Sequence, residues 1–310
     1  MSSRLVLGTI VLVALIIGGN FSALKFALDH TTPLLLTAMR TIIGGSVLIL
    51  FALSRGERFP ERLVDYRNIF VVSLSITTIS SGLLVSGVSR VPAGLASLIA
   101  STMPLFTAGL AFLLLGTAVS RVGAIGMVVG GIGTMILASP SMSGSTAAIG
   151  VAMLVVSALA WAFGNVFMKW RDFSGISPIM LVGVQLIMSA AVLLPVALIA
   201  EGASETDWST GLLWPLLYAA IPANAVTFAL LATVATRATP TQASATAYLI
   251  PVFGVTFGWL IRDERLGLVE VFGGVLVVVG VYLVVTSAAK AAASAARPAV
   301  SVPADLAIDD

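Results

Sequence analysis

The most constraining feature of this 310-residue chain is a series of ten long apolar runs separated by short polar gaps. A helix rises about 1.5 Å per residue, so about 20 apolar residues cross the hydrocarbon core of a bilayer. Strands are disfavoured, because barrel strands alternate apolar and polar residues and these runs do not. The sequence therefore predicts an all-α integral membrane protein with ten transmembrane helices, at residues 5–28, 33–53, 68–89, 92–115, 119–138, 147–170, 177–199, 212–235, 239–262 and 267–287.

Charged residues are too few to cover a water-facing surface. They make up 10% of the chain, and 58% of the residues are hydrophobic, whereas soluble domains carry about 25% charged residues. The formal net charge of +2 does not indicate nucleic-acid binding, because the basic residues lie in gaps where they set membrane orientation. We expect the lipid bilayer as the surroundings and no nucleic-acid partner.

The positions of lysine and arginine predict the orientation. With the N-terminus inside, eleven of these residues lie on inside segments and four on outside segments, while Arg40 lies within the second run. Basic residues favour the cytoplasmic side, so both termini are predicted to be cytoplasmic. The first run has an alternative interpretation as a signal peptide cleaved near Ala23. An internal repeat in the chain requires it as a helix.

The two halves of the chain resemble each other. A shift of 147 positions places Arg90 on Arg237, and it gives ten identities between residues 90 and 133 and their counterparts. We expect five-helix repeats at 1–138 and 147–287, a linker at 139–146 and a disordered tail at 288–310. Five helices are an odd number, so the second repeat must have inverted topology. Inverted repeats are typical of transporters, with the substrate site near the bilayer midplane.

The two repeats also resemble a known family. The motifs are Gly-Asn-Phe at 19–21 with Lys25, Pro33 and Arg40, then residues 89–97, 104–106 and 113–116, and in the second half 160–165 and 262–265. Over residues 5–287 the chain resembles the EamA family of the drug/metabolite transporter superfamily, whose ten-helix members include exporters such as the YddG-like proteins. It departs from the family pattern at Ile17, where Trp is usual, and at Gly116-Thr117, where Gly-Glu is usual. The resemblance implies export or facilitated diffusion of amino acids and related metabolites through a central cavity. A channel or a lipid or other-metabolite transporter of the same fold is the alternative.

Polar side chains within apolar runs are candidates for substrate binding, because they are costly in a bilayer unless they are paired. Trp161 stands out, since tryptophan favours the membrane surface but this one falls near the middle of a run. The alternative for each Ser and Thr is hydrogen bonding between packed helices, and for the aromatic residues it is core packing. The predicted substrate-binding residues are Asn20, Thr78, Ser97, Ser101, Trp161, Asn165, Asn224, Ser244 and Tyr248.

Three prolines within runs are predicted hinges for alternating access, with fixed kinks as the alternative: Pro104, Pro222 and Pro251. Arg40 lies about 10 Å along its helix. It is open to three interpretations: contact with a substrate carboxylate, a buried pair, or extension of its side chain to the lipid headgroups.

Absent residue types narrow the chemistry further. No Asp or Glu lies well inside a run, His30 is the only histidine, and there is no cysteine. We therefore expect a neutral or zwitterionic substrate, weak or no proton coupling, no metal site and no cofactor. No P-loop motif is present, and no nucleophile–base pair or ligand cluster of an intramembrane enzyme is available. The prediction is a multi-pass transporter of a bacterial inner membrane, a monomer or weak homodimer, and not an enzyme.

Overall fold

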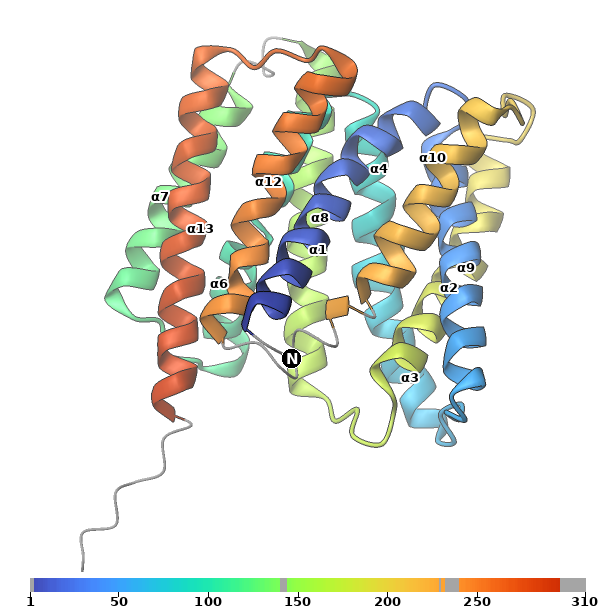
Figure 1. Cartoon of the computed structure of the whole chain (residues 1–310), viewed down its shortest axis with the longest axis horizontal. Coiled ribbons are helices and arrows are strands. Elements are labelled where there is room, and N and C mark those ends of the chain that lie inside the picture. Colours follow the sequence, from blue (N-terminus) through green and yellow to red (C-terminus); the bar gives the residue numbers. More distant parts are fainter. Residues whose placement is uncertain (1–2, 140–143, 229, 232–239, 296–310) are drawn as a thin grey trace, which may run out of the picture.

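The computed structural model describes the backbone of residues 3–139, 144–228, 230–231 and 240–295; the side chains at 3–4, 240–245 and 294–295 are outside the described set. All regular secondary structure among these residues is helical, and they contain no strand (Figure 1). The helices are α1 (Ser3–Ala27), α2 (Pro33–Ser54), α3 (Leu63–Val72), η1 (Ser73–Ser81), α4 (Gly82–Val88), α5 (Ala93–Ala100), α6 (Met103–Leu115), α7 (Arg121–Ala138), α8 (Ser145–Trp170), α9 (Pro178–Ala200), α10 (Thr210–Ala220), η3 (Ile221–Val226), α12 (Pro240–Arg262) and α13 (Leu268–Ala295).

Within the described residues, eight helical segments are long and apolar enough to cross a membrane, and two shorter apolar helices cover Thr210–Val226 and Thr246–Arg262. Apolar side chains also remain exposed at helical spacing, as at Val271, Val275 and Val279 on α13, which are 43–55% exposed. Such a face requires lipid around it. The chain is a multi-pass membrane protein. The predicted runs 212–235 and 239–262 meet at residues outside the described part.

Several helix boundaries differ from the sequence prediction. α3 begins at Leu63, five residues before the predicted start at 68. α8 begins at Ser145, two residues before the predicted start at 147. α13 continues to Ala295, so the helix includes the first eight residues of the predicted tail, 288–295. These residues are mostly alanine, which has the highest helix propensity. Residues 296–310 of the tail lie outside the described part.

The third and eighth passes each contain a wide π-helical segment. η1 continues from α3 into α4 without a loop, and η3 follows α10 directly. Pro222 is the second residue of η3, where its missing N–H and its ring disfavour a regular α turn. In η1, the hydroxyl of Ser75 donates to the carbonyl of Val71 at 2.9 Å, one of several Ser and Thr side chains that compete for the helix backbone. π segments often occur at functional sites.

The fourth pass is broken between α5 and α6, close to Pro104. A proline clashes with the carbonyl four residues earlier, and this carbonyl belongs to Ala100, the last residue of α5. Side-chain hydroxyls satisfy carbonyls before the break: Ser101 donates to Leu98 at 2.6 Å and Thr102 donates to Ile99 at 2.7 Å. The break is therefore stabilised from within the helix.

Helices far apart in the sequence form the main contacts. α7 packs against α13 at one edge of the bundle and α2 packs against α9 at the other (Figure 1). Between these pairs, α1 lies against α12 and α10, and α8 lies against α5, α6, α4 and η1. The start of α1 and the end of α13 lie at the same end of the bundle in Figure 1.

Glycines permit the close contact between α7 and α13. A Cβ atom at Gly280 would lie 2.5 Å from the Cα atom of Gly130, and one at Gly133 would lie 2.7 Å from the backbone nitrogen of Val277. The two backbones touch directly, as in small-residue contacts of membrane helices. The pair is closely packed at the edge of the bundle.

Charged side chains tie helices together at the opposite end from the start of α1. The carboxylate of Glu264, after α12, accepts hydrogen bonds from the backbone N–H groups of Ala93 (2.9 Å) and Gly94 (3.1 Å) at the start of α5. The carboxylate of Glu201 accepts similar bonds from Leu34 (2.9 Å) and Leu35 (3.3 Å) in the first turn of α2. Both carboxylates satisfy helix N-terminal donors and complement the helix dipole.

Candidate functional site: a central cavity

A cavity of about 380 Å³ lies in the middle of the bundle, within the range of roughly 300–1,000 Å³ that is usual for small-molecule sites. Its described walls come from α1, α2, η1, α4, α5, α6, α8, α9, η3 and α12, together with Thr227, Phe228 and Leu231. Both π segments and the α5–α6 break reach it. The irregular parts of the helices therefore surround the cavity.

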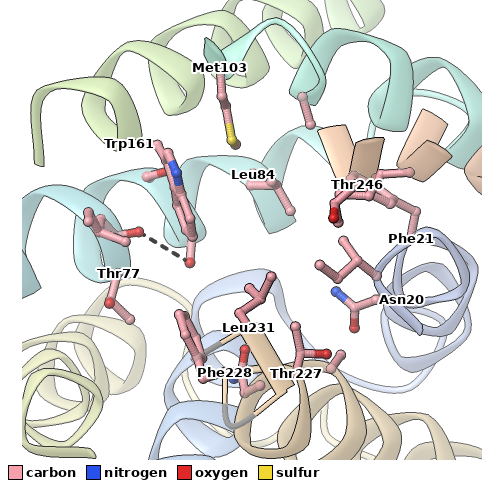
Figure 2. Close-up of a pocket in the computed structure, with 18 of the residues that line it drawn as sticks. Asn20, Phe21, Thr77, Leu84, Met103, Trp161, Thr227, Phe228, Leu231 and Thr246 are labelled. Atoms are coloured by element: carbon pink, nitrogen blue, oxygen red, sulfur yellow. Dashed lines mark hydrogen bonds between the residues drawn. The ribbon is translucent and has the colours of Figure 1, made fainter. Parts of the chain in front are cut away.

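One wall combines an aromatic ring with a hydrogen-bonded polar pair. Figure 2 shows Trp161 of α8 beside Thr77 of η1, with Met103 above. The Nε2 atom of Gln185, on α9, donates to Oγ1 of Thr77 at 2.8 Å, and the hydroxyl of Ser73 donates to the carbonyl of Gln185 at 2.7 Å. These bonds hold η1 against α9 and fix the polar side chains of this wall.

The other walls are mixed apolar and polar. Figure 2 shows Asn20 and Phe21 of α1 close to Thr246 of α12, and Thr227 and Phe228 along the adjacent side. The lining also includes the polar side chains of Arg40 and Asn224. A molecule in this cavity would meet polar groups at fixed positions among apolar surfaces.

Arg40 is the one charged side chain among the described residues that line the cavity. It is 5% exposed and lies seven residues into α2. On insertion scales, an arginine at the centre of a membrane helix costs about 2.5–3.5 kcal/mol. Within the described residues no carboxylate forms a salt bridge with it. The guanidinium gives the cavity a positive electrostatic potential.

The cavity brings together four of the nine predicted substrate-binding residues, and one of the three predicted hinges also lines it: Asn20, Ser101, Trp161 and Asn224, with Pro104. They come from α1, from the α5–α6 region, from α8 and from η3. Residues more than two hundred positions apart in the sequence thus line the same cavity.

Four other predicted residues lie outside the described cavity wall and have local partners. Thr78 donates to the hydroxyl of Ser189 at 3.0 Å. Ser97 is fully buried and donates to the carbonyl of Gly94 at 2.7 Å. Asn165 donates to the carbonyl of Trp161 at 2.9 Å. The bond of Thr78 joins η1 to α9 and fits the helix-packing alternative, whereas the bonds of Ser97 and Asn165 lie within their own helices.

The fourth, Tyr248, packs its ring edge-to-face against Tyr282 of α13, with centroids 5.8 Å apart, so this tyrosine contributes to the α12–α13 contact. Ser244 lies on α12, but its side chain is outside the described set. Pro222 contributes to a separate apolar hollow between α1 and α10. Pro251 lies within the continuous helix α12.

Several cavity residues were missing from the sequence-based set, among them Arg40, Thr77, Gln185 and Thr246. A pattern did point to Thr77, because Ser73, Thr77 and Ser81 are spaced four apart along one helix face. Thr77 and Ser81 line the cavity, whereas Thr78 faces α9. Choosing among adjacent polar residues required the actual path of η1.

The sequence matches the model of the EamA-like transporter family twice, at residues 4–139 and 148–286. The chain belongs to the EamA-like transporter family. The two matches together cover most of the chain. Members of this family are named as transporters and not as enzymes.

Similar proteins occur in bacteria and plants. A WAT1-related chloroplast protein of Arabidopsis thaliana is 30% identical, over 86% of this chain and 66% of its own length. The uncharacterized transporter YvbV of Bacillus subtilis is 30% identical over 85% of this chain and 86% of its own. A probable amino-acid metabolite efflux pump of Escherichia coli is 26% identical over 87% of this chain and 91% of its own.

A solved crystal structure shares the fold of this member of the EamA-like family. It covers 91% of this chain and 97% of its own, with a TM-score of 0.62 and 19% sequence identity. At this identity the likeness concerns the fold alone. The fold therefore recurs in a protein of distant sequence.

Proposed function

We propose that this protein moves amino acids and related small neutral or zwitterionic metabolites across a bacterial inner membrane, through its central cavity and by alternating access. The observation that carries the proposal is the cavity itself, which lies between helices of both halves of an EamA-family chain. The name of the Escherichia coli relative, a probable amino-acid metabolite efflux pump, supports the substrate class and the direction of export.

The proposed architecture is a pair of inverted five-helix repeats with both termini in the cytoplasm. The helix contacts support it. In the two repeats, α1 corresponds to α8, α2 to α9, the α5–α6 segment to α12, and α7 to α13. Corresponding helices pack together in the α2–α9 and α7–α13 pairs, and the α1–α12 contact has its counterpart in the contact of α8 with α5 and α6. Alternating access then arises when the two halves exchange conformations around the midplane site, with Pro104, Pro222 and Pro251 as proposed hinges.

The residues around the cavity support transport with weak or no proton coupling. The described residues that line it include no Asp, Glu or His. A proton-coupled carrier generally needs such a side chain to bind and release protons within the membrane. We therefore expect the substrate gradient to provide the driving force.

Transport assays in proteoliposomes test the proposal. Radiolabelled L-amino acids are offered outside, with and without a pH gradient and with the same unlabelled amino acid inside. A carrier gives saturable uptake that internal substrate accelerates, whereas a channel shows no such counterflow. Failure to transport any amino acid would refute the proposed substrate class, and strict dependence on the pH gradient would refute uncoupled transport.

Trp161→Ala is expected to reduce uptake about 10-fold while the protein remains folded. The ring forms part of the cavity wall beside Thr77 (Figure 2), and its removal takes away apolar contact with the substrate. Burial of a large side chain corresponds to about 1.5–3 kcal/mol. Trp259→Ala is the matched control, because Trp259 is 57% exposed on the outer surface of α12. Equal loss of uptake in both variants would argue against a substrate contact at Trp161.

A further inference from the structure

Four residues that line the cavity each have one buried polar atom without a hydrogen-bond partner: Asn20 Oδ1, Arg40 Nε, Asn224 Nδ2 and Thr246 Oγ1. Folded proteins pair nearly all buried polar atoms, because burial without a partner removes hydration and gives nothing in return. Of the eight such atoms in the described part of the chain, four thus surround one cavity, where a bound molecule can complete their hydrogen bonds.

The two unpaired donors belong to neighbouring helices. Gly44 lies one turn after Arg40 on α2, and a Cβ atom at Gly44 would lie 3.3 Å from the Cβ atom of Asn224 on η3. Arg40 is positively charged and offers N–H donors in a planar fork that matches a carboxylate. No carboxylate from the described lining residues neutralises it. This side of the cavity therefore suits an anionic group of a ligand.

The two unpaired oxygens lie together on another side. Asn20 belongs to α1 and Thr246 to α12, the two helices pack against each other, and Figure 2 shows both side chains next to Phe21. Neither oxygen carries a charge. Together they can accept hydrogen bonds from an ammonium group without attracting a bare cation as strongly as a carboxylate would.

We infer that Arg40 and Asn224 bind the carboxylate of an α-amino acid and that Asn20 and Thr246 accept hydrogen bonds from its ammonium group. This inference rests on the proposed function and specifies its substrate: an amino acid held in one orientation, with its side chain against the apolar part of the wall formed by Leu84, Met103 and Trp161. The carboxylate is required for binding because it neutralises a buried guanidinium.

The test compares analogues that each lack one charged group. Proteoliposomes receive radiolabelled L-leucine or L-phenylalanine, the corresponding acids without the amine (4-methylpentanoate and 3-phenylpropionate), or the corresponding amines without the carboxylate (3-methylbutylamine and 2-phenylethylamine). Protein-free liposomes give the background permeation of each compound. The wild-type protein is expected to transport the amino acids, to transport the amine-free acids more weakly, and to exclude the amines.

Substitutions on the two sides are expected to have different effects. Arg40→Gln should reduce uptake of amino acids and of amine-free acids about 10- to 100-fold, the usual loss for a charge-assisted hydrogen bond. Arg40→Lys should retain part of the activity, because it keeps the charge but not the planar fork. Asn20→Ala and the isosteric Thr246→Val should reduce uptake of the amino acids and leave the amine-free acids unaffected.

Arg55→Gln provides the matched control, since Arg55 follows the same helix and is 61% exposed. Size-exclusion profiles and thermal unfolding establish whether each variant folds. If Arg40→Gln does not fold, the analogue series in the wild-type protein still tests the inference.

Uptake of the amines at the rate of the amino acids, or normal uptake by Arg40→Gln, would overturn the inference and leave the proposed function intact. If no amino acid enters, the proposed function fails. The carboxylate assignment then stands only if the amine-free acids enter in an Arg40-dependent manner, and falls if they do not.

Discussion

Gly280→Leu is expected to cause a large loss of stability by forcing two helices apart. A Cβ atom at this position would lie 2.5 Å from both N and Cα of Gly130 and 2.6 Å from the carbonyl oxygen of Gly126. All three are backbone atoms, which cannot move aside by changing a rotamer, so α7 and α13 must separate. Overpacking typically costs about 1–3 kcal/mol and sometimes more, and we expect at least the upper end of this range.

Gly131→Leu is the control for this prediction. Gly131 lies on α7 next to Gly130, but nothing lies within 4 Å of the Cβ atom that a substitution would add. Glycine is unfavourable in a helix interior by about 0.8–1.0 kcal/mol relative to alanine, so the control should unfold at the wild-type temperature or slightly above it. Thermal unfolding in detergent measures both variants. Equal unfolding temperatures for the two would show that the α7–α13 contact is looser than the structure describes.

Glu264→Gln is expected to have the second-largest effect, with a lower unfolding temperature and a more accessible cavity. Glu264 accepts hydrogen bonds from the N–H groups of Ala93 and Gly94, and thereby joins the end of α12 to the start of α5. Bonds to a charged group contribute about 1.5–3 kcal/mol each. A glutamine keeps only one acceptor oxygen and places an NH₂ group against a backbone N–H. The control is Glu205→Gln, an exposed glutamate in the 201–208 gap.

Cysteine labelling measures the opening directly, because the natural sequence contains no cysteine. Ser101→Cys places a single thiol in the cavity wall. We expect faster reaction with a membrane-impermeant maleimide, added from the side that we propose to be outside, when Glu264→Gln is present. An unchanged labelling rate together with an unchanged unfolding temperature would rule out a role for this carboxylate in holding α5 and α12 together.

Among the described residues, the position that corresponds to Glu264 in the first half forms no charged contact between helices. Under the 147-residue repeat, Glu264 corresponds to Thr117. The hydroxyl of Thr117, which follows α6, donates to the carbonyl of Ala111 on α6 at 2.8 Å. The departure from the family pattern at this position, Gly-Thr in place of Gly-Glu, therefore coincides with the loss of a charged tie between helices.

Sequence patterns predicted the eight long apolar helices of the described part because the bilayer imposes a minimum apolar length on each pass. The observed bounds of α2, Pro33–Ser54, differ from the predicted 33–53 by one residue. The π segments could not be predicted in this way, since the hydrophobic pattern of η1 differs little from that of an α helix. Their cause is a local competition between Ser, Thr or Pro and the helix backbone, which composition alone does not reveal.

The binding residues were harder to predict than the fold. A polar residue in an apolar helix has the same sequence signature whether it faces a cavity or a neighbouring helix. Thr78 and Thr77 are adjacent, but one bonds to Ser189 and the other lines the cavity. Tyr248 occupies a mid-helix position and packs against Tyr282. Only the three-dimensional positions of the partner helices distinguish these cases.

The contact between α7 and α13 has a consequence for biosynthesis. α7 has its main contact with α13, the last helix of the bundle to be synthesised, and few contacts with the helices that precede it. A ribosome therefore delivers α7 to the membrane with its glycine-lined face bare, and this face stays against lipid until the segment from Leu268 onward emerges. Quality-control factors that inspect nascent membrane proteins would meet an open helix surface while residues 139–267, which separate the two helices, are made.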